Sequence, residues 1–156
     1  MITLLEINKA INNRIKQTLR ETEFKDVPIL AEDISEPIVR PSLRIAIEDS
    51  TTSQFNAACR ERTLICRIYF FAKNRYKYKF DNARMQEIIE CAFLEGLEVK
   101  EGFFIQIKEI ESEVSDTVLI CSFDLYMVEL IPEPTTNDIG ELIEPMEEIN
   151  INLRRE

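Results

Sequence analysis

The chain has 156 residues, 45% of them apolar, and a formal net charge of −10. A chain of this length can bury roughly 70% of its unfolded surface, so its core needs neither a metal nor a disulfide. The absence of histidine removes the commonest general base and metal ligand, which makes an enzyme the weakest functional class. The sequence also lacks both an apolar run of about 18 residues and a signal-peptide pattern, so we expect a soluble, cytosolic protein.

Residues 3–21 have the periodicity of an amphipathic helix. Thr3 and Glu6 fit a capping box, in which each side chain accepts a hydrogen bond from the other residue's backbone N–H. Apolar residues then recur every three or four positions and predict one buried stripe. The stripe comprises Leu4, Ile7, Ile11, Ile15 and Leu19. Residues 27–30 follow as a short edge strand, because Pro28 cannot donate to a ladder.

Two long strands are predicted next, at residues 41–48 and 60–71, joined by a polar, turn-like tip at residues 49–56. The second strand is apolar on nearly both faces. Its rows are Leu64, Cys66, Ile68 and Phe70 on one face and Ile65, Tyr69 and Phe71 on the other. A strand of this kind is usually central and covered on both sides. We therefore expect a helix over one face and another layer, such as a second copy, over the other.

A second helix is predicted over about residues 82–95, capped by Asp81 and ended by Gly96 in a left-handed conformation. Residues 103–107 alternate in polarity, and residues 116–130 form a last long strand. Helices and strands in this order indicate an α+β fold. We expect a mixed, mainly antiparallel sheet flanked by two helices.

Prolines at 132 and 134 end this predicted domain, which spans residues 1–131. Residues 132–156 form an acidic C-terminal extension in which Ile149, Ile151 and Leu153 alternate with asparagine. A strand that short is not stable alone, so the extension is expected to be flexible or to pair with a neighbouring subunit or another protein.

Charge is unevenly distributed between segments. Residues 40–84 carry ten basic and four acidic groups, whereas residues 85–131 carry two and eleven. Such asymmetry concerns association rather than fold. The four cysteines form no C-x-x-C pair, and Cys66, Cys91 and Cys121 fall on apolar rows, which favours buried thiols over disulfides.

Glu109, Glu111 and Glu113 alternate and therefore share one strand face. Such carboxylates could ligate a metal or act as a catalytic pair. No histidine accompanies them, so a solvated face is favoured, or the lining of a pore in an oligomer. No cofactor or metal is predicted.

Two basic clusters have similarly open interpretations. Residues 73–80 alternate lysine or arginine with aromatic side chains, as in single-stranded nucleic-acid sites, but a sequence pI near 4.7 favours a protein interface or a solvated connector. Arg40 and the pair Arg60 and Arg62 could clamp an anion. Without a nucleophile or base nearby, salt bridges or intersubunit contacts are the stronger interpretation.

Several segments follow one another in a recognisable order. They are the opening helix at residues 2–12, an extended segment ending in Glu32-Asp33, the run Arg40-Pro41-Ser42-Leu43, and Arg60-Glu61-Arg62-Thr63 leading into a strand that ends Tyr69-Phe70-Phe71. Together they resemble the tail terminator family of phages and of phage-tail-like particles from Gram-positive bacteria. The resemblance covers about residues 1–131, and the acidic extension is longer than the family pattern.

The resemblance implies a structural, non-enzymatic virion protein. Tail terminators form a ring, typically hexameric, that caps the finished tail tube, stops its polymerisation and presents a surface for head-tail joining. Expected partners are further copies of the chain, the tail tube protein, and in some tails the sheath and neck or portal-side proteins. DNA passes through without specific binding, and no membrane is involved. The protein would assemble in the host cytoplasm and remain at the head-proximal end of the tail.

On this interpretation we assign intersubunit or tube contacts to five arginines and pore lining to three glutamates. They are Arg40, Arg44, Arg60, Arg62 and Arg75, and Glu109, Glu111 and Glu113. Two alternatives stay open. One is a head-completion or neck connector protein. The other is a small-ligand-binding domain, which predicts a monomer or dimer with a deep pocket.

Overall fold

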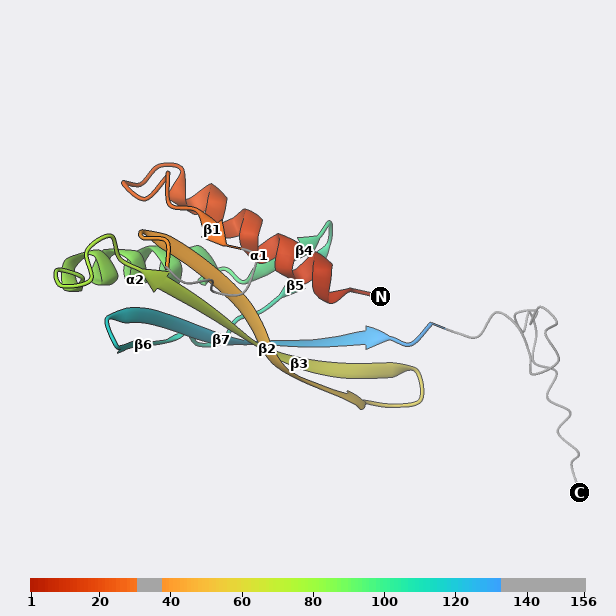
Figure 1. The fold of residues 1–156 in the computed structure, drawn as a ribbon. Helices are drawn as coiled ribbons and strands as arrows, with labels where there is room; N and C mark the ends of the chain where they lie inside the picture. Colours follow the sequence, from red (N-terminus) through yellow and green to blue (C-terminus); the bar gives the residue numbers. More distant parts are fainter. Residues whose placement is uncertain (31–37, 133–156) are drawn as a thin grey trace, which may run out of the picture.

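A computed structural model describes residues 1–30 and 38–132, and in it two helices lie on one face of a five-stranded sheet (Figure 1). The elements are α1 (Leu4–Leu19), β1 (Ile29–Leu30), β2 (Ser42–Gln54), β3 (Cys59–Phe71), α2 (Lys79–Phe93), β4 (Leu97–Lys100), β5 (Phe103–Ile105), β6 (Glu111–Ser115) and β7 (Val118–Leu130). The strand order is β1-β2-β3-β7-β6, in which only β1 and β2 are parallel. β4 and β5 form a separate hairpin, with β4 beside α1. The predicted α+β fold is confirmed.

The core lies between the helices and the covered face of the sheet. Alternate residues of β3 and β7 point into it, and each is at most 3% exposed. They are Leu64, Cys66, Ile68 and Phe70 of β3, and Leu119, Cys121, Phe123 and Leu125 of β7. The predicted stripe of α1 packs against them with one correction. Leu4 is exposed, and Ile2, which precedes the helix, is buried in its place.

Capping was predicted at three helix ends, and the structure agrees at two of them, the start of α1 and the end of α2. Thr3 and Glu6 form the capping box, with the Thr3 N–H donating to Glu6 Oε2 at 2.7 Å and the Glu6 N–H to Thr3 Oγ1 at 3.2 Å. Gly96 has φ +81°, as predicted after α2, and an added Cβ would lie 2.7 Å from Ile105 O. The predicted cap Asp81 is wrong. The helix already begins at Lys79, so Asp81 lies in its first turn.

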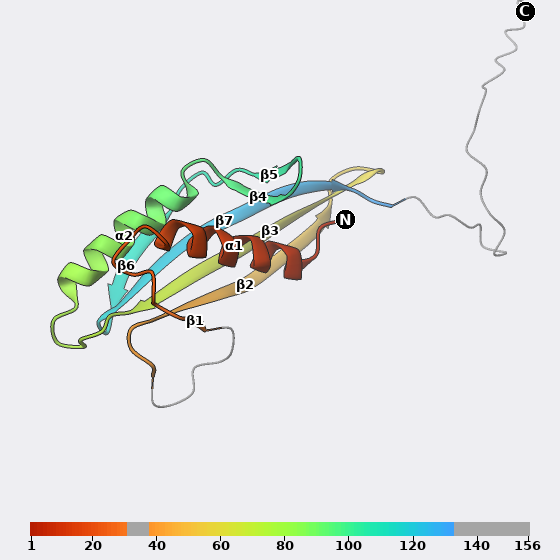
Figure 2. The same ribbon diagram turned by 90° about the horizontal axis from the view of Figure 1, so that it is seen from above.

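The predicted turn at residues 49–56 is shorter than expected, because β2 continues to Gln54. The pairing register shifts between Glu48 and Ser50, where Asp49 has φ +48°, and pairing with β3 then resumes. This bulge lets the hairpin run on past the helical layer. We define residues 50–62 and 126–132 as the arm, which projects beyond the first turn of α1 (Figure 2).

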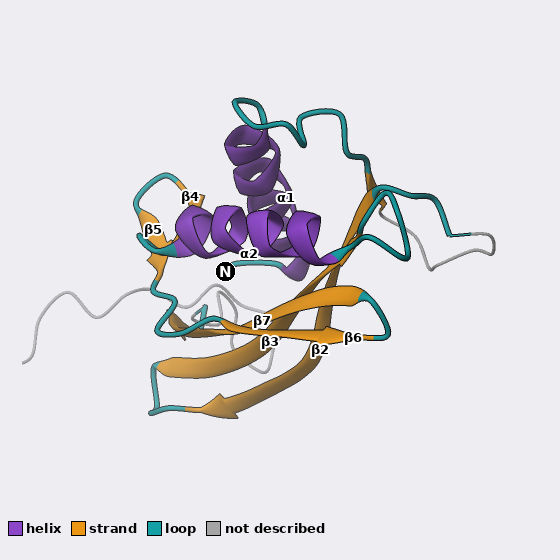
Figure 3. Ribbon diagram, turned by 90° about the vertical axis from the view of Figure 1, so that its left-hand side faces the viewer, coloured by secondary structure: helices purple, strands orange, loops and turns teal. Residues whose placement is uncertain are grey.

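The second face of the sheet is covered by no element of the described part of the chain (Figure 3). We call it the open face. The β3 row on this side is half-buried by its own neighbours and comprises Thr63, Ile65, Arg67 and Tyr69. The expected second layer over this row stays a prediction. The expectation for residues 133–156, and the loop around Glu36, lie outside the described residues.

All four cysteines are free thiols. Burial raises the pKa of Cys66 to about 12 and the pKa of Cys121 to about 11, so both are unreactive hydrophobes. The prediction for Cys91 is wrong. Its side chain is exposed, because the buried row of α2 runs through Met85, Ile89 and Ala92. No helix in the described residues is long and apolar enough to cross a membrane.

Candidate functional site

The open face has a charged cluster at its centre, built by three neighbouring strand positions. Arg67 forms an ion pair with Glu48, and Tyr69 Oη donates a hydrogen bond to Glu48 Oε1 at 2.9 Å. The hydrogen bonds from Tyr69 and Arg67 lower the pKa of Glu48. Burial, followed by the hydrogen bond to Glu48, raises the pKa of Tyr69. Arg44 adds a cation–π contact, with its guanidinium carbon 5.7 Å from the centre of the Tyr69 ring.

A second carboxylate on this face is fixed within the arm. Glu61 accepts hydrogen bonds from Ser53 Oγ at 2.7 Å and from Tyr126 Oη at 2.9 Å. These two bonds lower the pKa of Glu61 below its ordinary value. The ionised groups at the centre of the open face therefore have partners within the face itself.

The predicted acidic residues gather at the edge of the open face. Glu109 and Glu111 line an open hollow that Asp124 and Arg67 also line. Glu113 is opposite Ile120 in the register of β6 and β7 and shares the face with Glu111. All three glutamates are exposed. In the described residues no group of three or more side chains suited to a metal comes together.

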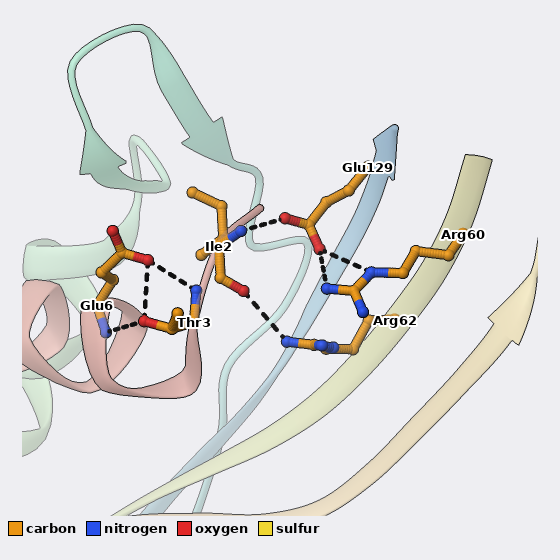
Figure 4. A network of polar contacts seen from close by, with 6 residues as sticks. All are labelled: Ile2, Thr3, Glu6, Arg60, Arg62 and Glu129. Atoms are coloured by element: carbon orange, nitrogen blue, oxygen red, sulfur yellow. Dashed lines mark hydrogen bonds and ion pairs between the residues drawn. The ribbon is translucent and has the colours of Figure 1, made fainter. Parts of the chain in front are cut away.

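A buried network within the arm joins three segments (Figure 4). Glu129 is only 7% exposed, and its Oε1 accepts a hydrogen bond from the Ile2 N–H at 2.5 Å. Its Oε2 accepts from Arg60, at 2.8 Å from Nη2. Arg62 Nη1 donates to Ile2 O at 3.4 Å. The network ties the start of α1 to β3 and β7, so it fixes the arm relative to the helices.

Glu129 is a residue that sequence reasoning missed. Burial alone raises its pKa, but the hydrogen bond from Ile2 and the ion pair with Arg60 outweigh burial, so the pKa lies below the ordinary value. A signal was present in the sequence. Glu129 continues the inward row of β7 two residues after Met127, where an apolar residue is expected.

The opposite end of the molecule carries residues 73–80, which we call the loop although the last two residues are the first two of α2. Arg75 lies 3.8 Å from Asp116, and Asn74 Oδ1 accepts hydrogen bonds from the backbone N–H groups of Tyr76 and Lys77. Two aromatic rings project outward here, because Tyr76 is 91% exposed and Phe80 is 69% exposed. The loop therefore has internal contacts of its own and still exposes its aromatic side chains to solvent.

The five arginines assigned to intersubunit contacts lie at the two ends and, for Arg44, at the centre of the open face, and all have contacts within the chain. Arg60 and Arg62 belong to the arm network, and Arg75 pairs with Asp116. Arg40 Nη1 donates to Ala72 O at 3.1 Å, beside the loop, and Arg44 lies over Tyr69. Contacts with another subunit would use their remaining donors, and the assignment stays a prediction.

The comparisons with known proteins identify the family. A family model described as phage tail terminator protein matches residues 6–137, which is most of the chain. No curated protein matches the sequence. The family is structural rather than enzymatic, and its members are components of phage tails. The chain belongs to the phage tail terminator family.

Proposed function

We propose that the protein forms a ring of identical subunits that caps the tail tube, stops its polymerisation and provides the surface for joining the head or collar. The observation that carries this proposal is the position of the exposed apolar side chains. Phe55 and Leu130, at the tip of the arm, are 56% and 74% exposed. Tyr76 and Phe80 are exposed in the loop at the other end of the sheet (Figure 1).

Two different apolar patches at opposite ends favour head-to-tail association. When two unlike patches bind each other, the resulting pair of subunits still has one free patch of each kind. Further subunits therefore add until the rotation between neighbouring subunits closes a ring. A single self-complementary patch would instead give a two-fold dimer. Contiguous exposed apolar patches mark interaction sites in soluble proteins, whereas single exposed side chains, such as Leu5, Leu94 and Phe104 here, are ordinary.

In such a ring the open face would line the channel. By strand register this face carries more carboxylates than cations, namely Glu48, Glu61, Glu111, Glu113 and Asp124 against Arg44 and Arg67. A wall with excess negative charge repels the DNA backbone, so DNA can pass without being held. This orientation supports the pore assignment of Glu109, Glu111 and Glu113.

The proposal is tested by polymerising purified tail tube protein with and without this protein. We expect shorter tubes that carry a ring at one end, the end that faces the head in a finished tail. Unchanged tube lengths and bare tube ends would contradict the proposal. Binding to portal-side proteins but not to tube ends would indicate a neck connector.

A matched pair of variants tests the contact between the two ends. Leu130→Ser alters the tip of the arm, whereas Leu5→Ser alters a leucine on the outer face of α1 that is more exposed, at 82% against 74%. We expect only Leu130→Ser to prevent ring formation and capping, because only that side chain lies at the proposed subunit contact. Equal behaviour of the two variants would argue against head-to-tail contact through the arm.

A further inference from the structure

We propose that residues 133–156 of one subunit bind the loop at residues 73–80 of the next subunit in the ring. This inference rests on the ring proposed above and names a second contact within it. It assigns a role to the acidic extension, and it identifies the partner of the basic loop as a second copy of this chain.

The loop presents two kinds of groups at once. Lys73, Lys77 and Lys79 are exposed, and within residues 1–30 and 38–132 none of them has an ion pair. Tyr76 and Phe80 stand beside them with most of their surface in solvent. A partner for this surface must therefore supply carboxylates and also apolar side chains to cover the rings.

The extension has this composition. Residues 133–156 contain seven acidic and two basic residues. Apolar residues are interspersed among the acidic ones, at Ile139, Leu142, Ile143, Met146, Ile149, Ile151 and Leu153. The extension therefore combines the negative charge and the apolar side chains that the loop requires, so the two segments are complementary in charge and in apolar content.

The direction of β7 indicates that the partner is another copy. The strand begins close to the loop, where Asp116 meets Arg75, and runs for 13 residues to the arm at the opposite end (Figure 2). To reach its own loop, the extension would have to turn back along a strand about 44 Å long. Fully extended, 24 residues span at most about 85 Å, so a return to its own loop would use about half of the extension's reach. In a head-to-tail ring, the arm of one subunit already faces the loop of the next.

The experiment uses the full chain assembled on tube ends, with the photoreactive residue p-benzoylphenylalanine in place of Tyr76. Chains carrying this residue are mixed with 15N-labelled chains before assembly. We expect photocrosslinks from position 76 to peptides of residues 133–156, joining labelled to unlabelled chains. The crosslink yield should fall steeply in about 1 M salt, where the Debye length is about 3 Å.

A charge-reversal variant and a matched control sharpen the test. Lys73→Glu, Lys77→Glu and Lys79→Glu together should lower the crosslink yield by about tenfold, because attraction becomes repulsion. Lys9→Glu, Lys16→Glu and Lys100→Glu change the net charge equally at other exposed positions and should leave the yield unchanged. Equal losses in both variants would show that net charge alone matters and would overturn the proposal.

Other outcomes overturn the proposal and are distinguishable from failure of the ring. Capped tubes with crosslinks only within one chain, or with none to residues 133–156, would refute this contact and leave capping intact. Crosslinks to tube protein would assign the loop to the tube. Binding of DNA that requires the three lysines would make the loop a nucleic-acid site. Uncapped tubes would refute the proposed function itself.

Discussion

The two faces of the sheet use neighbouring residues of the same strands in different ways. On β3, Ile68 points under the helices and is fully buried, whereas Ile65, three positions earlier, lies on the open face and is half-buried. Alternation along a strand places these residues on opposite faces. The covered face therefore holds the fold together, and the open face is free to serve assembly.

Carboxylates show the same division. On the covered face, Glu129 is buried and held by Ile2 and Arg60. On the open face, Glu48 and Glu61 are held by tyrosine, serine and arginine side chains while they remain near solvent. The buried group contributes to the stability of the fold, whereas the others maintain a charged surface at small cost.

The largest expected effect tests the covered face. Ile68→Ala should lower the free energy of unfolding by about 4 kcal/mol, because it removes buried methyl groups and leaves a cavity. Ile65→Ala should cost about 1 kcal/mol or less, because that side chain is already half in solvent. Urea denaturation measures both values. Similar losses at the two positions would show that the open face is also part of the core.

The next effect concerns the buried ion pair. Glu129→Gln should destabilise the protein by about 3 kcal/mol, because Arg60 then lies in a mostly buried position without a counterion. Glu48→Gln on the open face should cost about 1 kcal/mol. Denaturation at neutral pH compares the two variants, and an equal cost would remove the distinction between the faces.

The dependence of stability on pH follows from the same carboxylate. Because the pKa of Glu129 in the folded protein lies below its ordinary value of 4.5, its contribution is fully present above that value. The contribution is lost as the pH falls through the lowered pKa. We expect unfolding free energies measured from pH 7 to pH 3 to fall less steeply for Glu129→Gln than for the unmodified chain.

A smaller loss of stability is expected for a substitution in the turn between α2 and β4. Gly96 links α2 to β4 with φ +81° and lies against Ile105 O. Gly96→Ala should cost about 1–3 kcal/mol through backbone strain and this close approach. Gly102→Ala is the matched control, because Gly102 also has positive φ but an added Cβ there would meet no atom within 4 Å. A thermal melt of each variant separates crowding from strain.

The smallest effect on stability is expected at the edge of the open face. Replacing Glu109, Glu111 and Glu113 together by glutamine should change the free energy of unfolding by less than about 0.5 kcal/mol, because all three are exposed. If they line the channel, the same variant should retain DNA in assembled particles, measured by the rate of DNA release. Unchanged release would place them elsewhere.

Much of the fold could be predicted because it depends on local patterns. The capping box at Thr3, the alternation of β3 and the left-handed Gly96 each require only nearby residues. The sequence signalled the burial of Glu129 through its place in the inward row of β7, but not its partner Ile2, which is 127 residues away in the sequence. The length of the arm was also missed, because polar residues 50–54 become a strand only through pairing with β3.

The candidate site was predicted as residue types but not as an arrangement. Basic and acidic segments were visible in the sequence, yet the division of the arginines between two ends of the molecule depends on long-range strand pairing. Arg75 follows β3 and Asp116 precedes β7. They meet because the two strands pair antiparallel, which puts the turn after β3 and the turn before β7 at the same end of the sheet.

Electron microscopy of capped tube ends, at a resolution that places side chains, tests the central claim most directly. We predict a closed ring in which the arm of each subunit contacts the loop of the next and the open face lines the channel. Subunits related by two-fold axes, or a ring whose open face points outward, would contradict the account.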